Sequence, residues 1–539
     1  MDTQGIITGR YLNLPVKNGA PKHWVRLLIG SDVVREFEIE LADGKPDFWA
    51  FIDVSAHIGS PFSLEAEGLP EGLPGFASVR QSDSIEEAQD LYRERYRPQF
   101  HFTSRRGWNN DPNGLVYYQG EYHLFYQHNP FGVKWGNMYW GHAISRDLVH
   151  WEELDDALAP DALGQMFSGC AVVDWNNTAG FQRGEEKALI AIYTAAGGLT
   201  PSSKGQPFTQ CLAYSTDRGR SWTKYAGNPV LGHLMGGNRD PKVIWHEPTR
   251  QWIMALFLDP PKGQPNYALL GSPDLKRWTR LCEVTLPCGE CPDVFELPVD
   301  GSQANRKWVY WGGDGRYLIG SFDGQTFTPE TGPVRSYAGN AYAAQTYSDI
   351  PEGDGRRLQI AWLRGDLPGM PFNQQMTFPV ELTLRTTVQG PRLFVNPVKE
   401  IELLHDKRHT WENETLAEGG ANLLAGLSSD LFHLRAELEL GDAHEVGFVI
   451  RGLPVLYNAA KQEITCGKAV GALRPVEGRV RLEVLVDRAS IELFGNGGET
   501  YLVAGLIPAD DSKSLELISK GGTATVKSLK VYELRSAWR

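Results

Sequence analysis

Three acidic residues lie in segments where a carboxylate could do chemistry, and the first is Asp111. It belongs to the run Trp108-Asn-Asn-Asp-Pro-Asn-Gly114. Asn-Asp-Pro-Asn-Gly is a dense turn signal, so a well-capped loop is the ordinary interpretation. Here, however, amides on both sides can hold the carboxylate ionised and aim it at a ligand.

The second and third acidic residues are Asp240 and Glu290. Asp240 lies in Arg239-Asp-Pro-Lys242, where the proline favours an extended conformation that would point the carboxylate into a cavity. Glu290 lies in Cys288-Gly-Glu-Cys-Pro292, among small and apolar residues, where loss of hydration favours the protonated form that a general acid needs. Taken singly, a surface ion pair and a solvated turn residue explain these two segments as well.

A recurring phrase indicates the fold that must position these residues. Between residues 97 and 384 a strand pattern is followed by Ser-x-Asp, a tight turn and an aromatic residue. Asp caps such a turn with its carboxylate, and the aromatic residue begins the return strand. Four copies at intervals of several tens of residues favour a β-propeller over unrelated hairpins. The copies are Ser145–Trp151, Ser215–Trp222, Ser272–Trp278 and Ser321–Phe327.

Both ends of the chain also read as short strands, so we predict an all-β protein. The expected N-terminal strands are Tyr11–Val16, Trp24–Ile29, Val33–Leu41, Asp47–Val54 and Phe62–Ala66. The expected C-terminal strands are Leu431–Leu440, Glu445–Ile450, Val480–Asp487, Ser490–Phe494 and Ala524–Leu534. Each set predicts a β-sandwich. Residues 81–96 are polar and rich in Glu and Arg, which predicts a linker helix.

Composition narrows the function. The net charge of −13 argues against nucleic-acid or anionic-membrane partners, and no apolar run is long enough for a membrane span. The first ten residues lack the pattern of a signal peptide, so the sequence as read predicts a cytoplasmic protein, or an extracellular one if a leader has been removed. Six cysteines in 539 residues suggest free thiols, because Cys288 and Cys291 lack the second ligand pair of a zinc site and the βαβ context of a redox motif.

Together and in this order, the three acidic segments resemble the signatures of glycoside hydrolase family 32, which includes invertases, inulinases and levanases. Further phrases resemble the family across about residues 97–539. They are Phe125–Pro130, Trp135–His142, Phe167–Cys170, Met370–Pro379 and Val486–Phe494. Cys170, Gly289 and Val380 depart from common family residues, which affects the pocket rim more than the chemistry. The N-terminal part resembles the small β-domain that precedes the propeller in some bacterial levanase-like members.

The resemblance implies five blades, one more than the four repeats. We therefore expect a small N-terminal β-sandwich-like domain (1–80), a linker helix (81–96), a five-bladed β-propeller catalytic domain (97–395) and a C-terminal β-sandwich (396–539). The resemblance also implies that Asp111 is the nucleophile, Glu290 the acid/base and Asp240 the transition-state stabiliser. The residues implied to bind the terminal fructosyl unit are Asn110, Gln127, Trp135, Phe167, Ser168 and Arg239.

The implied reaction is retaining hydrolysis of β-fructofuranosyl residues in fructans or fructo-oligosaccharides. We expect exo action on terminal residues, because the loop Met370–Gln375 and the N-terminal domain could form walls of the pocket. Retention requires Asp111 and Glu290 carboxyl groups about 5–5.5 Å apart. Neither a metal nor a cofactor is expected, because a proton suffices for the leaving group. Endo-levanase, endo-inulinase or fructosyltransferase action on the same scaffold stays open, as do the linkage preference and the oligomeric state. A propeller enzyme acting on arabinans or xylans fits the motifs poorly, and a non-catalytic sugar-binding protein has no need of all three carboxyl groups.

Overall fold

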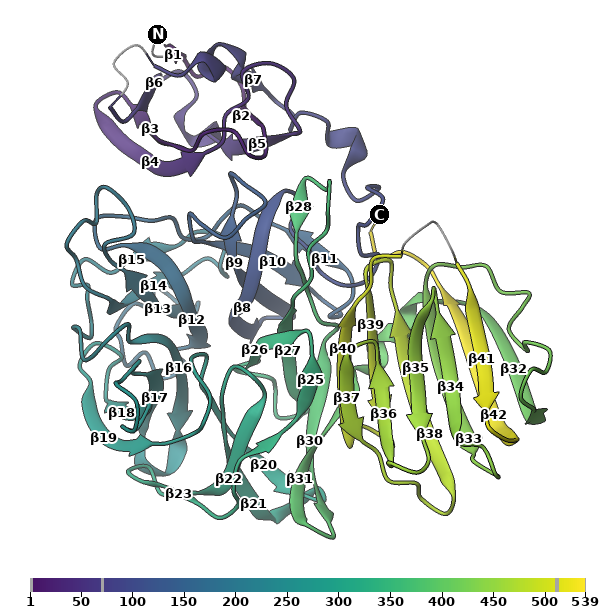
Figure 1. Cartoon of the computed structure of the whole chain (residues 1–539). Coiled ribbons are helices and arrows are strands. Elements are labelled where there is room, and N and C mark those ends of the chain that lie inside the picture. Colours follow the sequence, from purple (N-terminus) through teal and green to yellow (C-terminus); the bar gives the residue numbers. More distant parts are fainter. Residues whose placement is uncertain (1–2, 69–71, 509–512, 539) are drawn as a thin grey trace.

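The computed structural model describes residues 3–68, 72–508 and 513–538 and is built almost entirely from β-strands (Figure 1). The N-terminal domain consists of two small sheets with strand orders β1-β6-β3-β4 and β5-β2-β7. All five strands expected there are present, to within two residues at each end. The seven strands are β1 (Thr3–Ile6), β2 (Tyr11–Val16), β3 (His23–Ile29), β4 (Asp32–Ile39), β5 (Phe48–Asp53), β6 (Pro61–Ala66) and β7 (Arg80–Ser82).

The segment expected to be a linker helix is not an α-helix. Over residues 81–96 only Ala88–Asp90 forms a single 3-10 turn, η3. The backbones of Glu87 and Tyr92 take left-handed conformations (φ +59° and +63°), which interrupt any helix. The segment is instead held by long-range contacts, because the ring of Tyr92 stacks on Trp538 with ring centres 4.3 Å apart. Polar composition alone gave no sign of these contacts.

The central part forms a five-bladed β-propeller, and Figure 1 looks into its centre with the blades following one another around it. Blade 1 contains β8 (Gly107–Tyr118), β9 (Glu121–Asn129), β10 (Tyr139–Ser145) and β11 (Trp151–Glu153). Blade 2 contains β12 (Gln165–Val173), β13 (Leu189–Ala196), β14 (Thr209–Ser215) and β15 (Thr223–Lys224). Blade 3 contains β16 (Arg239–His246), β17 (Gln251–Phe257), β18 (Tyr267–Ser272) and β19 (Thr279–Val284). Each blade is a sheet of successive antiparallel strands.

Blades 4 and 5 share one continuous sheet. Blade 4 contains β20 (Asp293–Val299), β21 (Ser302–Trp311), β22 (Arg316–Phe322) and β23 (Phe327–Pro329), with β24 (Val334–Arg335) paired to β22. Blade 5 contains β26 (Ala341–Thr346), β27 (Arg357–Leu363), β30 (Val380–Thr387) and β31 (Gly390–Pro397). Short strands β28 (Phe372–Asn373) and β29 (Gln375–Met376) pair with β8 and β27.

Each predicted Ser-x-Asp phrase is the turn between the third and fourth strands of blades 1 to 4. In blade 1, for example, Asp147 Oδ1 accepts hydrogen bonds from the backbone amides of Val149 (3.0 Å) and His150 (2.8 Å). The corresponding turn of blade 5, between β30 and β31, reads Thr387-Val-Gln-Gly390 and carries neither Ser nor Asp at those positions. This difference explains why the repeat count found four blades instead of five.

Strand direction determines which segments meet at each end of the propeller. Because neighbouring strands in a blade are antiparallel, the start of the innermost strand lies at the same end as the loop between the second and third strands. The Ser-x-Asp turns lie at the opposite end. We call these the pocket end and the far end of the propeller.

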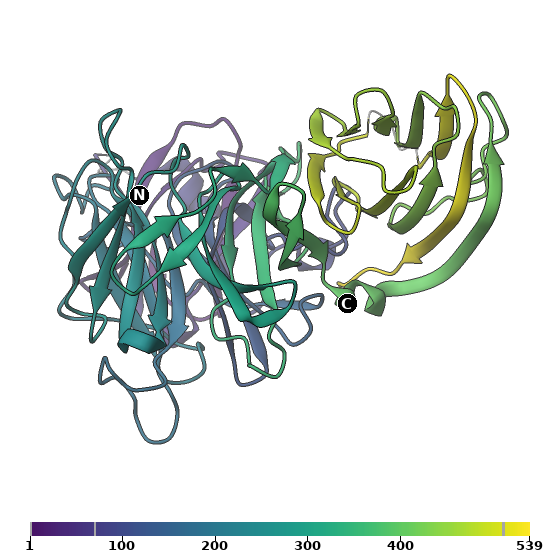
Figure 2. The ribbon, with the colours of Figure 1, turned by 90° about the horizontal axis from the view of Figure 1, so that it is seen from below.

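The C-terminal domain is a sandwich of two antiparallel sheets beside the propeller (Figures 1 and 2). One sheet has the order β25-β40-β39-β38-β33-β42-β32, and the other has the order β37-β36-β35-β34-β41. Its strands are β25 (Tyr337–Gly339), β32 (His405–Leu416), β33 (Phe432–Glu439), β34 (Glu445–Ile450), β35 (Leu453–Asn458), β36 (Glu463–Cys466), β37 (Ala469–Ala472), β38 (Arg479–Val486), β39 (Ser490–Gly495), β40 (Thr500–Gly505), β41 (Leu515–Lys520) and β42 (Ala524–Leu534). All five expected strands are present.

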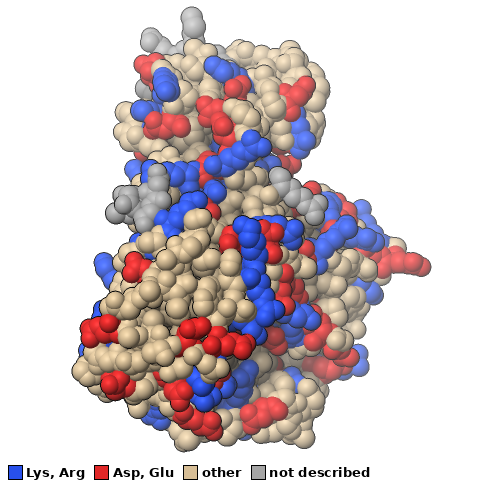
Figure 3. Space-filling view, turned by 90° about the vertical axis from the view of Figure 1, so that its right-hand side faces the viewer, with Lys and Arg blue, Asp and Glu red and all other residues tan. Residues whose placement is uncertain are grey.

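On the face seen in Figure 3, basic and acidic side chains are interspersed.

A buried ionic cluster joins this sandwich to the segment that leads into the propeller. His101 is fully buried, and its ring nitrogens lie 2.9 Å from Asp487 Oδ2 and 2.7 Å from Glu492 Oε1. Burial alone would lower the pKa of His101, but hydrogen bonds and charges from the two carboxylates outweigh it and raise the pKa to about 9. The Val486–Phe494 phrase therefore has a structural role at the junction of the two domains.

Within the described part of the chain, no helix is long and apolar enough to cross a membrane.

Candidate active site

The innermost strands of all five blades begin at the pocket end, and the pairing of four of them is irregular near the start. The strand pairing shifts register across Asn110 and Asp111 in β8, at Ser168 in β12 and across Asp240 in β16. It shifts again at Ala343 in β26. β-Bulges bend a strand and redirect its side chains, and they tolerate the prolines that follow both aspartates. Asp111, Ser168 and Asp240 therefore come from bulges.

Asp111 is held from two sides at the base of the pocket. Asn110 Nδ2 donates to Asp111 Oδ1 (3.1 Å), and Ser168 Oγ donates to Asp111 Oδ2 (2.7 Å). The amide of Asn110 is itself fixed, since Trp108 Nε1 donates to its oxygen (2.8 Å). Three residues that the sequence associated with this site therefore meet, and their contacts fix the direction of the carboxylate.

Asp240 does not take the extended conformation expected from the following proline. Its φ is +62°, in the left-handed region, which Asp tolerates better than most residues. Proline disfavours the right-handed helical conformation, and the bulge at the start of β16 selects the left-handed one. The amide of Asp240 donates to Thr194 Oγ1 (3.0 Å), and its carboxylate accepts from the amide of Cys291 (3.0 Å). The carboxylate still reaches the pocket, as the sequence predicted.

Glu290 lies across the pocket on a turn before β20. Its backbone and that of Cys291 both have positive φ (+46° and +45°), a strained pair of the kind found at functional sites. Arg239 donates to Glu290 Oε2 through Nη2 (2.9 Å) and Nε (3.1 Å). The hydroxyl of Tyr342 donates to Glu290 Oε1 (2.6 Å).

The thiol of Cys291 connects the other two carboxyl groups. Its Sγ lies 3.7 Å from Asp111 Oδ2 and 3.5 Å from Asp240 Oδ2. All six cysteines, including Cys288 and Cys291, are free. A narrow cavity lies at Asp111, Asp240 and Cys291 and is lined mainly by small side chains. Its lining residues are Asp111, Pro112, Ser168, Gly169, Asp240, Cys291, Pro292, Ala343, Ala344 and Gln345.

Burial and mutual repulsion shift the proton affinity of this cluster. Burial raises the pKa of Asp240 to about 7, with further increases from Glu290 and Asp111, although the charge of Arg239 opposes it. The pKa of Asp111 is also raised, first by burial and then by Glu290, against hydrogen bonds from Ser168 and Asn110. The sequence favoured Glu290 as the protonated acid, and this stays a prediction. Burial favours the protonated forms of Asp240 and Asp111, whose pKa values it raises.

Aromatic side chains form one wall of the pocket. Trp135, half exposed, contacts Phe167 edge-to-face with ring centres 5.9 Å apart, and Phe167 contacts Phe208 in the same way at 5.5 Å. Phe167 lies on the strand that carries Ser168, so this wall is continuous with the carboxyl cluster. Gln127 is buried behind it, and its amide donates to the carbonyl of Met166 (2.8 Å). Gln127 thus supports the wall from behind.

The N-terminal domain holds the loop that carries Trp135. The side-chain amide of Asn137 accepts from the backbone N–H of Glu38 (2.7 Å) and donates to its carbonyl (2.7 Å), like one more residue added to strand β4. Phe37 stacks on Phe131 at 3.9 Å between ring centres. These contacts fix the β9–β10 loop at the pocket end.

The same strand holds a second loop, between β13 and β14. Glu36 Oε2 accepts from the backbone amide of Ser202 (3.0 Å), and Arg26 pairs with the other carboxylate oxygen of Glu36 (2.9 Å). Both loops lie at the pocket end, so the N-terminal domain braces one side of the pocket rim.

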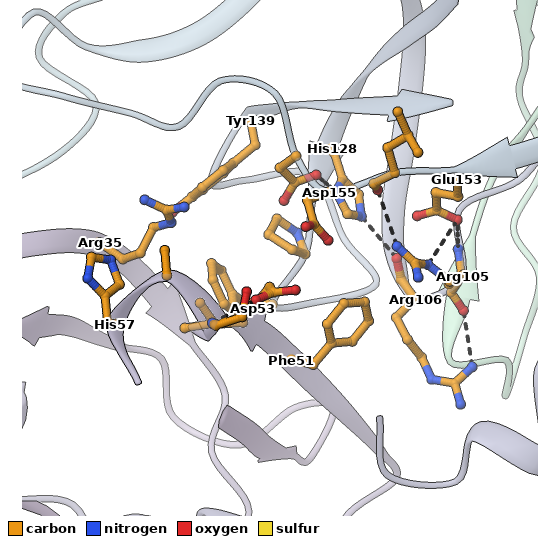
Figure 4. A pocket seen from close by; sticks show the side chains of 17 residues that line it. Arg35, Phe51, Asp53, His57, Arg105, Arg106, His128, Tyr139, Glu153 and Asp155 are labelled. Carbon is orange, nitrogen blue, oxygen red and sulfur yellow. Dashed lines mark hydrogen bonds and ion pairs between the residues drawn. The ribbon is translucent and has the colours of Figure 1, made fainter. Parts of the chain in front are cut away.

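A separate cavity of about 250 Å³ lies between the N-terminal domain and blade 1 (Figure 4). Charged side chains of both signs line it, among them Asp53, Asp155 and Arg105. Burial raises the pKa of Asp155, with a further contribution from the charge of Asp53. This cavity contains none of the three predicted catalytic residues, and we interpret it as part of the domain junction.

Two residues that contact the cluster, Tyr342 and Cys291, had no predicted role. Cys291 lies in the segment Cys288–Pro292 that was identified from the sequence, but its thiol contact with Asp111 and Asp240 was not predicted. Tyr342 is at the start of β26, the innermost strand of the blade that lacks the Ser-x-Asp phrase. Placing a fifth innermost strand by its spacing from the other four would have pointed to this region.

Comparison with known proteins identifies the family of this chain. Residues 101–397 match the model of the glycosyl hydrolases family 32 N-terminal domain, and residues 400–533 match that of the family 32 C-terminal domain. A levanase of Bacillus subtilis is 41% identical over 496 residues, which cover 83% of this chain and 72% of the levanase. An extracellular exo-inulinase of Aspergillus awamori is 32% identical over 534 residues, covering 83% of this chain and 96% of that protein.

The fold agrees as well. A crystal structure of exo-inulinase from Aspergillus awamori superposes with a TM-score of 0.74 at 31% identity, covering 83% of this chain and 100% of the inulinase chain. The N-terminal domain lies outside both family matches. The sequence matches, the propeller with its sandwich and the cluster of three carboxyl groups lead to one conclusion: the chain belongs to glycosyl hydrolase family 32.

Proposed function

We propose that this protein is a retaining exo-β-fructosidase that removes terminal β-fructofuranosyl units from fructans of the levan or inulin type and from related oligosaccharides. The observation that carries the proposal is the convergence of Asp111, Asp240 and Glu290 around one thiol and one guanidinium. The similarity to a levanase and an exo-inulinase supports fructan as the substrate class.

The proposed reaction proceeds in two displacement steps. Glu290 protonates the glycosidic oxygen while Asp111 attacks C2, so the C2–O bond breaks and a covalent fructosyl-enzyme forms. Glu290 then removes a proton from water, the water oxygen bonds to C2, and the bond to Asp111 breaks. Positive charge on the sugar is greatest in the transition state, where the carboxylates of Asp111 and Asp240 stabilise it most. The expected separation of the two reacting carboxyl groups is about 5–5.5 Å.

Contacts in the site position the reacting groups. Fructosyl hydroxyls that donate to Asp240 favour its ionised form, which stabilises positive charge in the transition state. Arg239 and Tyr342 hold the Glu290 side chain in position for proton transfer. Asn110 and Ser168 orient Asp111, and Trp135 and Phe167 pack against the sugar.

Loops held in place on one side of the pocket end support exo action over endo action in this proposal. The loop carrying Trp135 and the loop carrying Ser202 are both braced by the N-terminal domain, which favours a pocket over an open cleft. Asn373 adds a further link, since its amide donates to the carbonyl of Val133 (3.0 Å) in the first of these loops. A pocket closed on this side admits a chain end and excludes the middle of a polymer.

The product profile tests the proposal. Levan, inulin and sucrose are incubated with purified protein and early products are separated by chromatography. We expect fructose as the first product, with no ladder of oligosaccharides. A ladder or transfer products would replace the exo assignment with endo or transferase action, and absence of product from all three substrates would refute the fructosidase assignment. Glu290→Gln should lose about 10²–10⁴-fold in kcat while still binding fructan.

A further inference from the structure

A cavity of about 430 Å³ opens at the far end of the propeller, away from the three carboxyl groups. Its lining comes from the last residues of the innermost strands β12 and β16 and from the segment after β26. In β12, Ser168 lies on the side of the carboxyl groups and Val173 lines the cavity, and the five residue steps between them span roughly 17 Å at about 3.3 Å per residue. The cavity is therefore distinct from the active site.

Two tryptophans give this cavity aromatic surfaces. Trp175 is 49% exposed, although large aromatic side chains are usually more buried. Its indole N–H donates to Asp349 Oδ1 (2.8 Å), which fixes the ring while leaving a face open. Trp245 is half-buried and packs edge-to-face on Trp252, with ring centres 5.1 Å apart. An ordered, exposed tryptophan beside a second one is suited to the C–H faces of a sugar ring.

Polar groups without protein partners lie among these rings. Tyr347 is fully buried, and its hydroxyl has no hydrogen-bond partner in the described part of the protein. The buried hydroxyl of the neighbouring Ser348 also has no hydrogen-bond partner among the described residues. Both residues line the cavity. Both hydroxyl oxygens are shielded from solvent, so they add polar character to the wall behind the cavity surface, and the exposed lining must provide the contacts to a ligand.

Asp349 adds an acceptor under backbone strain. Its φ is +61°, and its Oδ2 accepts from the backbone amide of Val173 (2.8 Å). Burial raises its pKa to about 6, against the hydrogen bonds from Val173 and Trp175. Arg357, also in the lining, adds guanidinium donors, one of which donates to the carbonyl of Tyr347 (3.3 Å). Acceptors, donors and aromatic faces in one cavity match a neutral polyhydroxylated ligand better than an ion or an apolar molecule.

We propose that this cavity, formed by Trp175, Trp245, Ser348 and Asp349, is a second carbohydrate site that binds fructosyl units of a fructan chain. The choice of fructan among neutral sugars rests on the proposed function. A site remote from catalysis holds the polymer near the enzyme and raises the effective concentration of chain ends at the pocket. It contributes to polymeric substrates and not to sucrose.

Affinity electrophoresis in native gels that contain levan or inulin tests the proposal. Every protein carries Glu290→Gln, so the active site is identical throughout and differences report on the cavity. Trp175→Ala should weaken retardation by about three- to tenfold in apparent Kd, in line with the loss of one aromatic contact. Val388→Ala, which truncates an exposed apolar side chain on the turn between β30 and β31, is the matched control and should not change retardation.

The second measurement is enzyme activity, in proteins that retain Glu290. Trp175→Ala should lower kcat/KM on levan by a similar factor and leave sucrose hydrolysis unchanged. If Trp175→Ala does not fold, Asn176→Ala decides, because Asn176 is an exposed polar residue of the cavity lining. Equal retardation of the variants and the parent would overturn the second site, as would retention by dextran alone. Failure of the proposed function is separate: the wild type would then release no fructose from any fructan.

Discussion

Replacing Asp240 by asparagine should make the protein more stable at neutral pH while abolishing most of its activity. The carboxyl group of Asp240 is fully buried, and its pKa rises from 3.8 to about 7. Asparagine keeps the shape and can accept the same hydrogen bond from the amide of Cys291. The substitution therefore removes one buried charge with little other change.

The sign and size follow from proton linkage. Between pH 3.8 and about 7 the native state binds more protons than the unfolded chain, so the stability of the wild type falls as pH rises through this window. One pKa unit corresponds to 1.36 kcal/mol, so the shift from 3.8 to about 7 gives a full cost of about 4 kcal/mol for ionising Asp240 in the native state. This value is an upper limit, because relaxation of the protein and water around a buried charge lowers its effective cost.

Thermal unfolding of both proteins at pH 4 and pH 8 measures the effect. Asp240→Asn should gain little at pH 4 and raise Tm by roughly 5 °C at pH 8. Asp259→Asn is the matched control: Asp259 also faces Arg239 (3.5 Å) but is about half exposed, so its substitution should give no such pH-dependent gain. Equal effects of Asp240→Asn at the two pH values would refute the assignment of a raised pKa. Activity should fall by about 10²–10³-fold.

Three further substitutions probe the pocket, the domain junction and the rim. Tyr342→Phe removes the hydroxyl that donates to Glu290. In steady-state kinetics on sucrose it should lower kcat about tenfold with little change in KM. An unchanged kcat would exclude a positioning role for Tyr342. His101→Ala should destabilise the protein by about 3–5 kcal/mol at pH 6, since it leaves two buried carboxylates unpaired. The proton-linked part of the His101 contribution, about 3 kcal/mol, is fully present below pH 6.5 and is lost as pH rises through about 9, so urea titrations of the wild type should weaken over that range. Asn137→Ala should release the Trp135 loop and raise KM for sucrose several-fold at nearly constant kcat, and appearance of oligosaccharides from inulin would follow if the rim enforces exo action.

Local sequence patterns predicted most of the fold. Strands such as Tyr11–Val16, Glu445–Ile450 and Ala524–Leu534 have the predicted bounds, because alternating apolar residues and turn signals are short-range information. The turn chemistry of Ser145–Trp151 and its repeats identified four blades for the same reason. The fifth blade lacks that chemistry, and only the family resemblance supplied it.

Features that depend on distant contacts were not predictable in this way. The left-handed backbone of Asp240 results from a bulge in the pairing of β16 with β17, which the proline alone does not specify. Tyr342 reaches Glu290 from a different blade, 52 residues along the chain. The expected linker helix is replaced by turns because Tyr92 packs on Trp538, close to the other end of the chain. The three carboxyl groups were found because each lies in its own short motif.

The central claim is that Asp111 forms a covalent bond to the fructosyl unit while Glu290 acts as acid and base. Mass spectrometry of Glu290→Ala protein mixed with a fructoside that carries a good leaving group tests it most directly, since such a substrate needs no acid for the first step and the second step is slow without the base. We expect protein that is heavier by one fructosyl unit to accumulate, with the fructosyl unit attached to the peptide that contains Asp111. A fructosyl unit on another residue, or release of fructose with inverted configuration and no adduct, would contradict it.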